Sequence, residues 1–190
     1  ARAGAAWGLM SARIGLIEHQ LAVAEAASAR AAPRVLLADE VGLGKTIEAG
    51  LILSRLAASG RVTRALVLVP EALVYQWFVE LKRRFNVDSA IFDEERVEAI
   101  ELAKDGRNPF EDEQVVLTDL PFLLSSPERS AQVLGAHWDL VLVDEAHHLQ
   151  WSTERASPEY ALVEQLAARA PSLILLTATP EQLGQSGHFA

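Results

Sequence analysis

Short apolar runs alternate along the chain with longer stretches in which apolar residues recur every three or four positions. A short continuous apolar run is typical of a strand buried on both faces, and the longer spacing is typical of one side of a helix. The runs predict strands at 35–38, 65–69, 90–92, 115–118, 139–143 and 172–176. The spacing predicts helices at 18–31, 45–59, 72–85, 94–104 and 158–169.

Two prolines complicate the stretch 121–135, since Pro121 and Pro127 each stand where a helix can begin. This stretch therefore predicts either one broken helix or two short ones. Strands that alternate with helices indicate an α/β fold, with a parallel sheet of about six or seven strands and helices on both faces. Residues 1–17 predict an irregular lead-in to a single domain at 18–190. In the first helix we expect Leu21 and Val23 to point inward.

Composition narrows the class of protein. The chain has 190 residues, of which 50% are apolar and 23% charged, as in ordinary globular domains. Its net charge of -9 excludes a protein that holds nucleic acid by overall charge, so any such contact must be local. The apolar runs are far shorter than the ~18 residues that cross a bilayer, so we expect a cytoplasmic protein with no membrane partner. The chain begins with Ala rather than Met, which predicts a segment of a longer protein.

The stretch 35–46 predicts a phosphate-binding loop. A buried strand is followed by a turn with Gly42 and Gly44 and then by the start of a helix. Glycines let successive N–H groups and the positive end of the helix dipole point at one anion. Lys45 is then expected to reach the β- and γ-phosphates of a nucleotide, and Thr46 to hold Mg²⁺. The residues predicted to bind the nucleotide in this loop are Asp39, Glu40, Val41, Gly42, Leu43, Gly44, Lys45 and Thr46.

A second group of polar residues follows the strand at 139–143. Asp144 is expected to hold Mg²⁺, and Glu145 to orient and deprotonate the water that attacks the γ-phosphate. Two solvated acids at the start of a helix give the same pattern, so this pair is informative mainly together with the loop. Thr177 and Thr179 end the last predicted strand at the same sheet edge, where their hydroxyls can hydrogen-bond to the acidic pair.

Trp77 shares its helical spacing with Leu81 and Phe85. We therefore expect its ring in the core rather than on the surface as a platform for nucleic-acid bases.

Three motifs carry a family resemblance: Asp-Glu-x-Gly-Leu-Gly-Lys-Thr at 39–46, Asp-Glu-Ala-His at 144–147 and Thr-Ala-Thr-Pro at 177–180. In this order and at these separations they resemble motifs I, II and III of superfamily-two helicases, specifically the Swi/Snf-type double-stranded DNA translocases. Asp39, where the general loop pattern has glycine, is usual in that family. Further stretches at 16–20 and 108–110 resemble its bacterial members that associate with RNA polymerase.

The resemblance implies the first RecA-like lobe of a two-lobe motor that uses ATP and Mg²⁺. The strand ending at Thr177 would then lie between those leading to Lys45 and Asp144. Other implied roles are adenine recognition by Gln20, catalysis by Lys45 and Glu145, and coupling of nucleotide state to DNA by His147, Thr177 and Thr179. The residues implied along one DNA strand are Pro70, Glu71 and Gln76.

The implied partners are RNA polymerase, double-stranded DNA and a second RecA-like lobe of the same protein. The implied function is regulation of transcription and recycling of polymerase, near the nucleoid. The motifs of the second lobe, with its arginine fingers, are absent from this sequence. Because an arginine finger contributes ~10³ to 10⁵ in rate in related chemistry, we expect the chain alone to hydrolyse ATP poorly.

Two alternatives stay open. One is a non-catalytic module that uses a nucleotide-binding fold to hold a protein partner, although Lys45, Thr46, Asp144 and Glu145 are all present. The other is a lobe of an RNA helicase with the same Asp-Glu-Ala-His motif. Stimulation by duplex DNA rather than RNA would separate this second alternative from a DNA translocase.

Overall fold

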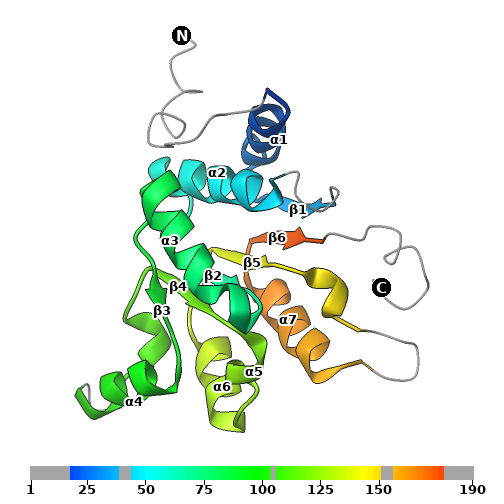
Figure 1. Ribbon diagram of the computed structural model, residues 1–190. Helices are drawn as coiled ribbons and strands as arrows, with labels where there is room; N and C mark the ends of the chain where they lie inside the picture. Colours follow the sequence, from blue (N-terminus) through cyan, green and yellow to red (C-terminus); the bar gives the residue numbers. More distant parts are fainter. Residues whose placement is uncertain (1–17, 39–43, 104–105, 151–155, 178–190) are drawn as a thin grey trace.

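Six parallel strands form the centre of the molecule in a computed structural model that describes residues 18–38, 44–103, 106–150 and 156–177. The spatial order is β1-β6-β5-β2-β4-β3, and each neighbouring pair is parallel (Figure 1). This arrangement confirms the predicted α/β class. The strands are β1 (Arg34–Leu37), β2 (Ala65–Leu68), β3 (Ala90–Ile91), β4 (Val115–Thr118), β5 (Leu140–Val143) and β6 (Ser172–Leu176).

The helices lie close to their predicted positions. They are α1 (Glu18–Ser28), α2 (Lys45–Ala58), α3 (Val74–Phe85), α4 (Glu94–Ala103), α5 (Leu120–Leu123), α6 (Pro127–Gly135) and α7 (Pro158–Arg169), with 3₁₀ turns η1 (Glu71–Leu73), η2 (Pro109–Glu111) and η3 (Ala146–His148). The stretch 121–135 forms two helices, because Asp119 and Ser126 each cap one with a side-chain oxygen. No helix in the described ranges is long and apolar enough to cross a membrane.

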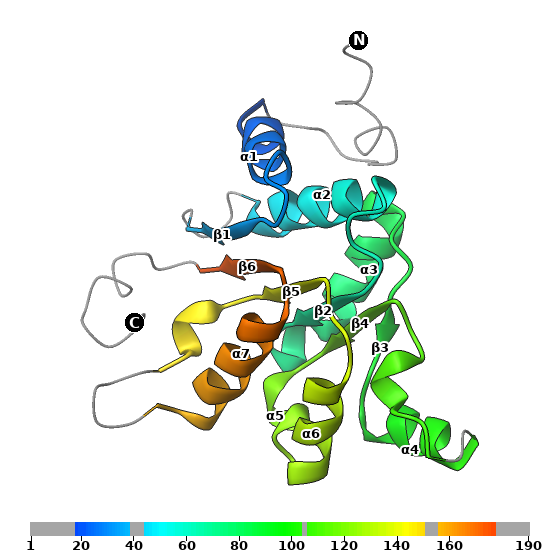
Figure 2. The ribbon, with the colours of Figure 1, turned by 180° about the vertical axis from the view of Figure 1, so that it is seen from behind.

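Helices cover both faces of the sheet, as predicted (Figures 1 and 2). Successive strand residues face opposite layers: Val67 packs with α2 and α3, whereas Leu66 and Leu68 pack with α4 to α7. Both layers exclude water from the inner strands β2, β4 and β5, which explains their continuous apolar runs. The prediction of a strand buried on both faces is wrong for β1, which lies at the edge of the sheet and leaves Leu36 44% exposed.

The first helix departs from its predicted orientation. It packs on the outside of α2 rather than on the sheet, and it buries Ala24 and Ala27 (Figure 2). Leu21 and Val23, which were expected to point inward, are only half-buried. Alanines allow two helices to approach closely, so the small residues form this contact.

The contact between α2 and α3 depends on a glycine. A Cβ atom on Gly50 would stand 2.3 Å from Cε2 of Phe85, whose side chain is fully buried. The ring therefore lies directly on the α2 backbone and fixes α3 against it.

We predict that Gly50→Ala lowers the free energy of unfolding by about 1–3 kcal/mol, because the added methyl group overpacks this contact. Gly135→Ala is the matched control, since the nearest atom to its new Cβ would be 3.5 Å away, an ordinary contact. Urea unfolding of both variants measures the difference. Equal stability of the two variants would contradict the predicted overpacking.

At the amino-terminal ends of β2 and β5, Asp139 joins the two strands. Its Oδ2 accepts hydrogen bonds from the Thr63 N–H (2.8 Å), the Thr63 hydroxyl (2.7 Å) and the Arg64 N–H (2.9 Å). Its Oδ1 lies 3.0 Å from Nε2 of His137. Burial by itself raises the pKa of Asp139, but the bonds from Thr63, Arg64 and His137 outweigh it and lower the pKa to about 2.

We predict that Asp139→Asn costs about 2 kcal/mol of stability at pH 7 and roughly half as much near pH 3. The folded pKa is depressed, so the carboxylate stabilises the fold fully above its unfolded pKa and loses this contribution as pH falls through about 2. Urea unfolding of wild type and variant at both pH values tests this expectation. A stability difference that does not change with pH would contradict it.

Candidate nucleotide site

The carboxyl ends of β1, β6, β5 and β2 lie side by side along one edge of the sheet. The Thr177 N–H donates to the Leu37 carbonyl at 3.1 Å, and the Asp144 N–H donates to the Leu68 carbonyl at 2.8 Å. The strand ending at Thr177 thus lies between those leading to Lys45 and Asp144, as the family resemblance implied.

The start of α2 lies beyond the end of β1. Gly44 is its N-cap, with a left-handed backbone at φ 90° that favours glycine, and Lys45 and Thr46 are half-buried in its first turn. The first N–H groups of a helix, together with its dipole, attract an anion. The remaining predicted loop residues, 39–43, and also Thr179 lie outside the described residues.

Gln20 reaches this helix start from α1. Its side chain is buried, and its Nε2 stands only 2.2 Å from the place that a Cβ on Gly44 would occupy. The structure therefore brings Gln20 to the predicted phosphate loop, while adenine recognition stays a prediction.

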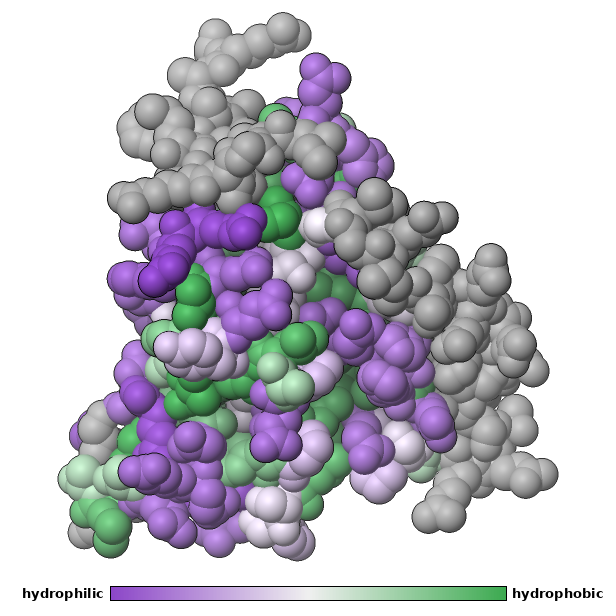
Figure 3. All heavy atoms as spheres, in the orientation of Figure 1, coloured by the Kyte–Doolittle hydropathy of each residue, from purple (hydrophilic) through white to green (hydrophobic). Residues whose placement is uncertain are grey.

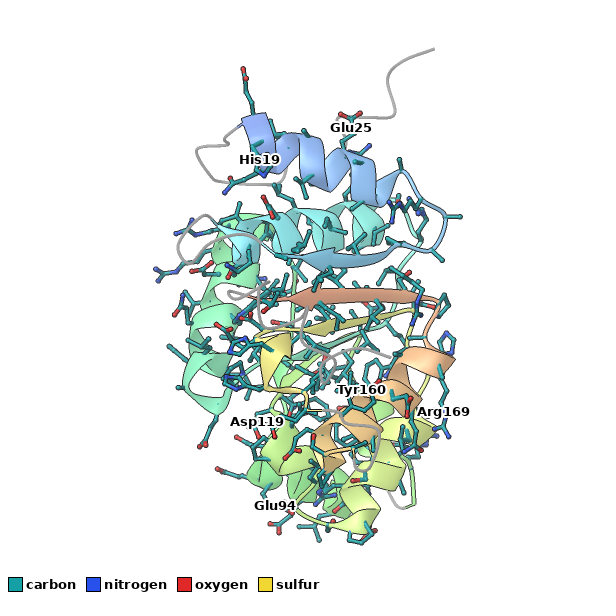
Figure 4. All side chains as sticks on the ribbon, turned by 90° about the vertical axis from the view of Figure 1, so that its right-hand side faces the viewer. His19, Glu25, Glu94, Asp119, Tyr160 and Arg169 are labelled. Carbon is teal, nitrogen blue, oxygen red and sulfur yellow. The ribbon has the colours of Figure 1, made fainter. Side chains whose placement is uncertain are left out.

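A second contact between α1 and α2 pairs Nε2 of His19 with Oε1 of the buried Glu48 at 3.8 Å. Figure 4 shows His19 on the side of α1 that faces α2, whereas Glu25 points away.

Asp144 receives two hydrogen bonds from different parts of the chain. Its Oδ2 accepts the indole N–H of Trp77 at 2.9 Å, and its Oδ1 accepts the Glu145 N–H at 2.8 Å. Trp77 is buried, as predicted, and cannot stack on a nucleic-acid base. Its bond to Asp144 was not predicted: the helical spacing places the ring inside, but no pattern in the sequence shows which acceptor its N–H meets.

The electrostatics of Asp144 favour a bound cation. Burial raises the pKa of Asp144, and the charge of Glu145 raises it further; the bond from Trp77, the Glu145 N–H and the charge of Lys45 lower it without cancelling the rise. A carboxylate that is partly withdrawn from water beside a second carboxylate is stabilised by a metal ion. With the Thr46 hydroxyl in the first turn of α2, these oxygen ligands fit Mg²⁺.

Glu145 has a left-handed backbone, with φ 52° and ψ 43°. This conformation costs roughly 1–2 kcal/mol for a residue with a side chain, and such strain is concentrated at functional sites. It directs the chain into η3 and places Oε2 of Glu145 3.1 Å from Nδ1 of His147. The predicted coupling residue His147 is therefore next to the predicted general base.

A cavity of about 270 Å³ lies on the other side of the acidic pair from α2, and Pro70, Asp144, Glu145 and Glu159 are among its lining residues. A larger cavity, of about 470 Å³, has Val62 and Val115 among its lining residues and contains none of the predicted site residues. Position along the sheet edge, rather than size, therefore identifies the candidate site.

The residues implied along DNA follow β2 in a single stretch. Pro70 borders the smaller cavity, Glu71 is exposed in η1, and Gln76 is exposed on α3 with its Nε2 3.3 Å from Oε1 of Glu80. Hydrophilic residues cover much of the face seen in Figure 3, and the last turn of α3 adds three exposed basic residues, Lys82, Arg83 and Arg84. Positive charge is thus concentrated locally on a chain of net charge -9.

Fold and site together define a RecA-like domain: a parallel sheet with a glycine-capped helix and an acidic pair at one edge. The chain belongs to the SNF2-related domain family, whose family model matches residues 19–187. The resemblance seen in the three motifs is thereby confirmed.

The chain is 56% identical over 184 residues to the RNA polymerase-associated protein RapA of Pseudomonas fluorescens. This match covers 97% of the chain and 19% of the relative. The chain is 57% identical over 183 residues to RapA of Vibrio parahaemolyticus, with 96% and 19% covered. The chain thus spans about a fifth of the length of these relatives.

The fold is similar to the solved structure of the Sulfolobus solfataricus SWI2/SNF2 ATPase core in complex with dsDNA. The TM-score is 0.73 at 23% sequence identity, and the match covers 90% of this chain and 33% of the other. At that identity the match supports the fold alone.

Proposed function

We propose that this chain is the ATP-binding lobe of an ATP-dependent double-stranded DNA translocase that acts on RNA polymerase. The observation that carries the proposal is the arrangement at one sheet edge: the half-buried Lys45 and Thr46 begin α2, and the half-buried Asp144 and Glu145 directly follow β5. This arrangement brings cationic, hydroxyl and carboxylate groups together where a nucleotide phosphate and its metal bind.

In this proposal each residue has a defined role. Lys45 binds the β- and γ-phosphates, Thr46 and Asp144 hold Mg²⁺, and Gln20 recognises adenine. When bound, Mg²⁺ neutralises charge on the phosphate oxygens. Glu145 orients the attacking water and accepts its proton, and His147, 3.1 Å away, senses this step. Thr177 and Thr179 connect the site to the DNA track.

The partners follow from relatives and from the site. RNA polymerase is named in the relatives' own description, and duplex DNA is named for the solved SWI2/SNF2 core. We assign Pro70, Glu71 and Gln76 to one DNA strand because Pro70 lines the same cavity as Asp144 and Glu145, and Glu71 and Gln76 follow it closely in the chain and are exposed. We place the complete protein in the cytoplasm, near the nucleoid.

A second RecA-like lobe completes the site in this proposal. The chain spans about a fifth of its relatives' length, and an arginine supplied by the second lobe would stabilise charge in the transition state. The chain alone therefore binds MgATP but hydrolyses it slowly.

We predict that Glu145→Gln, made in the protein together with its second lobe, keeps MgATP affinity within about threefold but lowers turnover by about 10²-fold or more, because the amide cannot accept the proton. Glu159→Gln is the matched control: it removes a carboxylate from the same cavity and leaves turnover nearly unchanged. Phosphate release measured with duplex DNA, with RNA and without nucleic acid gives the comparison.

Unchanged turnover in Glu145→Gln would contradict the general-base role. Stimulation of the wild-type protein by RNA but not by duplex DNA would favour the RNA-helicase alternative instead. Failure of the wild type to hydrolyse ATP under any of these conditions would favour a non-catalytic module.

A further inference from the structure

The buried indole of Trp77 connects α3 to Asp144. Only 2% of this side chain is exposed, and its N–H donates to Oδ2 of the carboxylate at 2.9 Å. The two residues come from neighbouring β-α units: Asp144 directly follows β5, and Trp77 lies in the first turn of the helix that follows β2. The bond is thus a tertiary contact between segments 67 positions apart in the sequence.

The Trp77 bond restricts the rotation of the carboxylate. The other oxygen of Asp144 accepts the N–H of Glu145, the next residue, so this second bond moves with the local backbone. Of the two hydrogen bonds described for this carboxylate, only the one from the indole ties it to a separate element, α3. Groups that orient a metal ligand in this way typically change metal affinity by about 10- to 100-fold when they are removed.

The position of the indole is itself fixed further along the same buried side of α3. Leu81 and Phe85 continue the buried stripe of Trp77, and the Phe85 ring lies on the backbone of Gly50 in α2. Helix α2 begins at Lys45, the proposed phosphate-binding residue. Helix α3 thus contacts α2 through Phe85 and contacts Asp144 through Trp77. Helix α3 therefore sets the relative position of the two.

We propose that Trp77 is a positioning residue of the nucleotide site, which holds the Asp144 carboxylate in the orientation that receives the metal of MgATP. This inference rests on the proposed function. In this role Trp77 acts through Asp144, to which its N–H donates, rather than on the nucleotide itself. Pro70 and Glu71 lie in the segment that leads into α3, and Gln76 lies in its first turn beside Trp77, so a shift of this stretch moves the same hydrogen bond.

The test compares two buried tryptophans. Trp77→Phe removes the N–H but keeps an aromatic ring in the core. Trp138→Phe is the matched control, because Trp138 is also buried and its N–H donates at the same 2.9 Å, to the backbone carbonyl of Val133. Both variants lose one indole hydrogen bond of the same length, but only the Trp77 variant loses a bond to a carboxylate.

The measured quantity is the ratio of ATP affinity with Mg²⁺ to ATP affinity with EDTA, obtained by titration of a fluorescent ATP analogue. We expect Trp77→Phe to lower this ratio about tenfold with the EDTA affinity unchanged, and Trp138→Phe to leave it at the wild-type value. If Trp77→Phe does not fold, β-(3-benzothienyl)alanine at position 77 replaces the N–H with sulfur and keeps the ring shape.

A wild-type ratio in the Trp77 variant, or an equal fall in both variants, would overturn the positioning role. Neither result would contradict the proposed function, since the wild type would still bind MgATP. Absence of ATP binding by the wild type, by contrast, would overturn both.

Discussion

Parallel pairing of β1, β6, β5 and β2 is the constraint on which the rest of the structure depends. It brings the carboxyl ends of four strands to one edge, and so it assembles residues from distant parts of the chain. Packing against two different helical layers fixes the register of the strands. A slip by one residue would move each side chain of a strand into the opposite layer. At the opposite edge, Asp139 secures the β2–β5 pair with three hydrogen bonds to Thr63 and Arg64. These bonds at the amino-terminal end of β5 thus support the position of Asp144, which follows its carboxyl-terminal end.

The candidate site combines features that each oppose stability. Asp144 is half-buried beside a second carboxylate, and Glu145 has a left-handed backbone. The surrounding structure maintains both features. The Trp77 and Glu145 N–H groups donate hydrogen bonds to the Asp144 carboxylate. Pairing of β5 with β6 holds the backbone that leads to Glu145. Under the proposed function, a site arranged in this way would need little reorganisation when a cation and phosphate bind.

Local patterns in the sequence predicted most of the architecture, because apolar runs and helical spacing directly reflect burial on two faces or on one. The three motifs predicted the family to which the chain belongs and the meeting of their strands at one edge of the sheet. Contacts between elements were beyond such patterns. Nothing local shows that the Trp77 N–H meets Asp144 or that α1 packs on α2 through Ala24 and Ala27, and a left-handed Glu145 carries no compositional signal. These features depend on how elements pack in three dimensions.

The most direct test of the account is the affinity of this chain for MgATP, measured by isothermal titration calorimetry for the wild type and for Lys45→Ala. The account predicts binding by the wild type and affinity about 10- to 100-fold weaker in the variant, since charge-assisted bonds to phosphate contribute about 1.5–3 kcal/mol. Circular dichroism establishes that the variant is folded. Equal affinity of the two proteins would contradict the account, because the residues at the start of α2 would then not form the phosphate site.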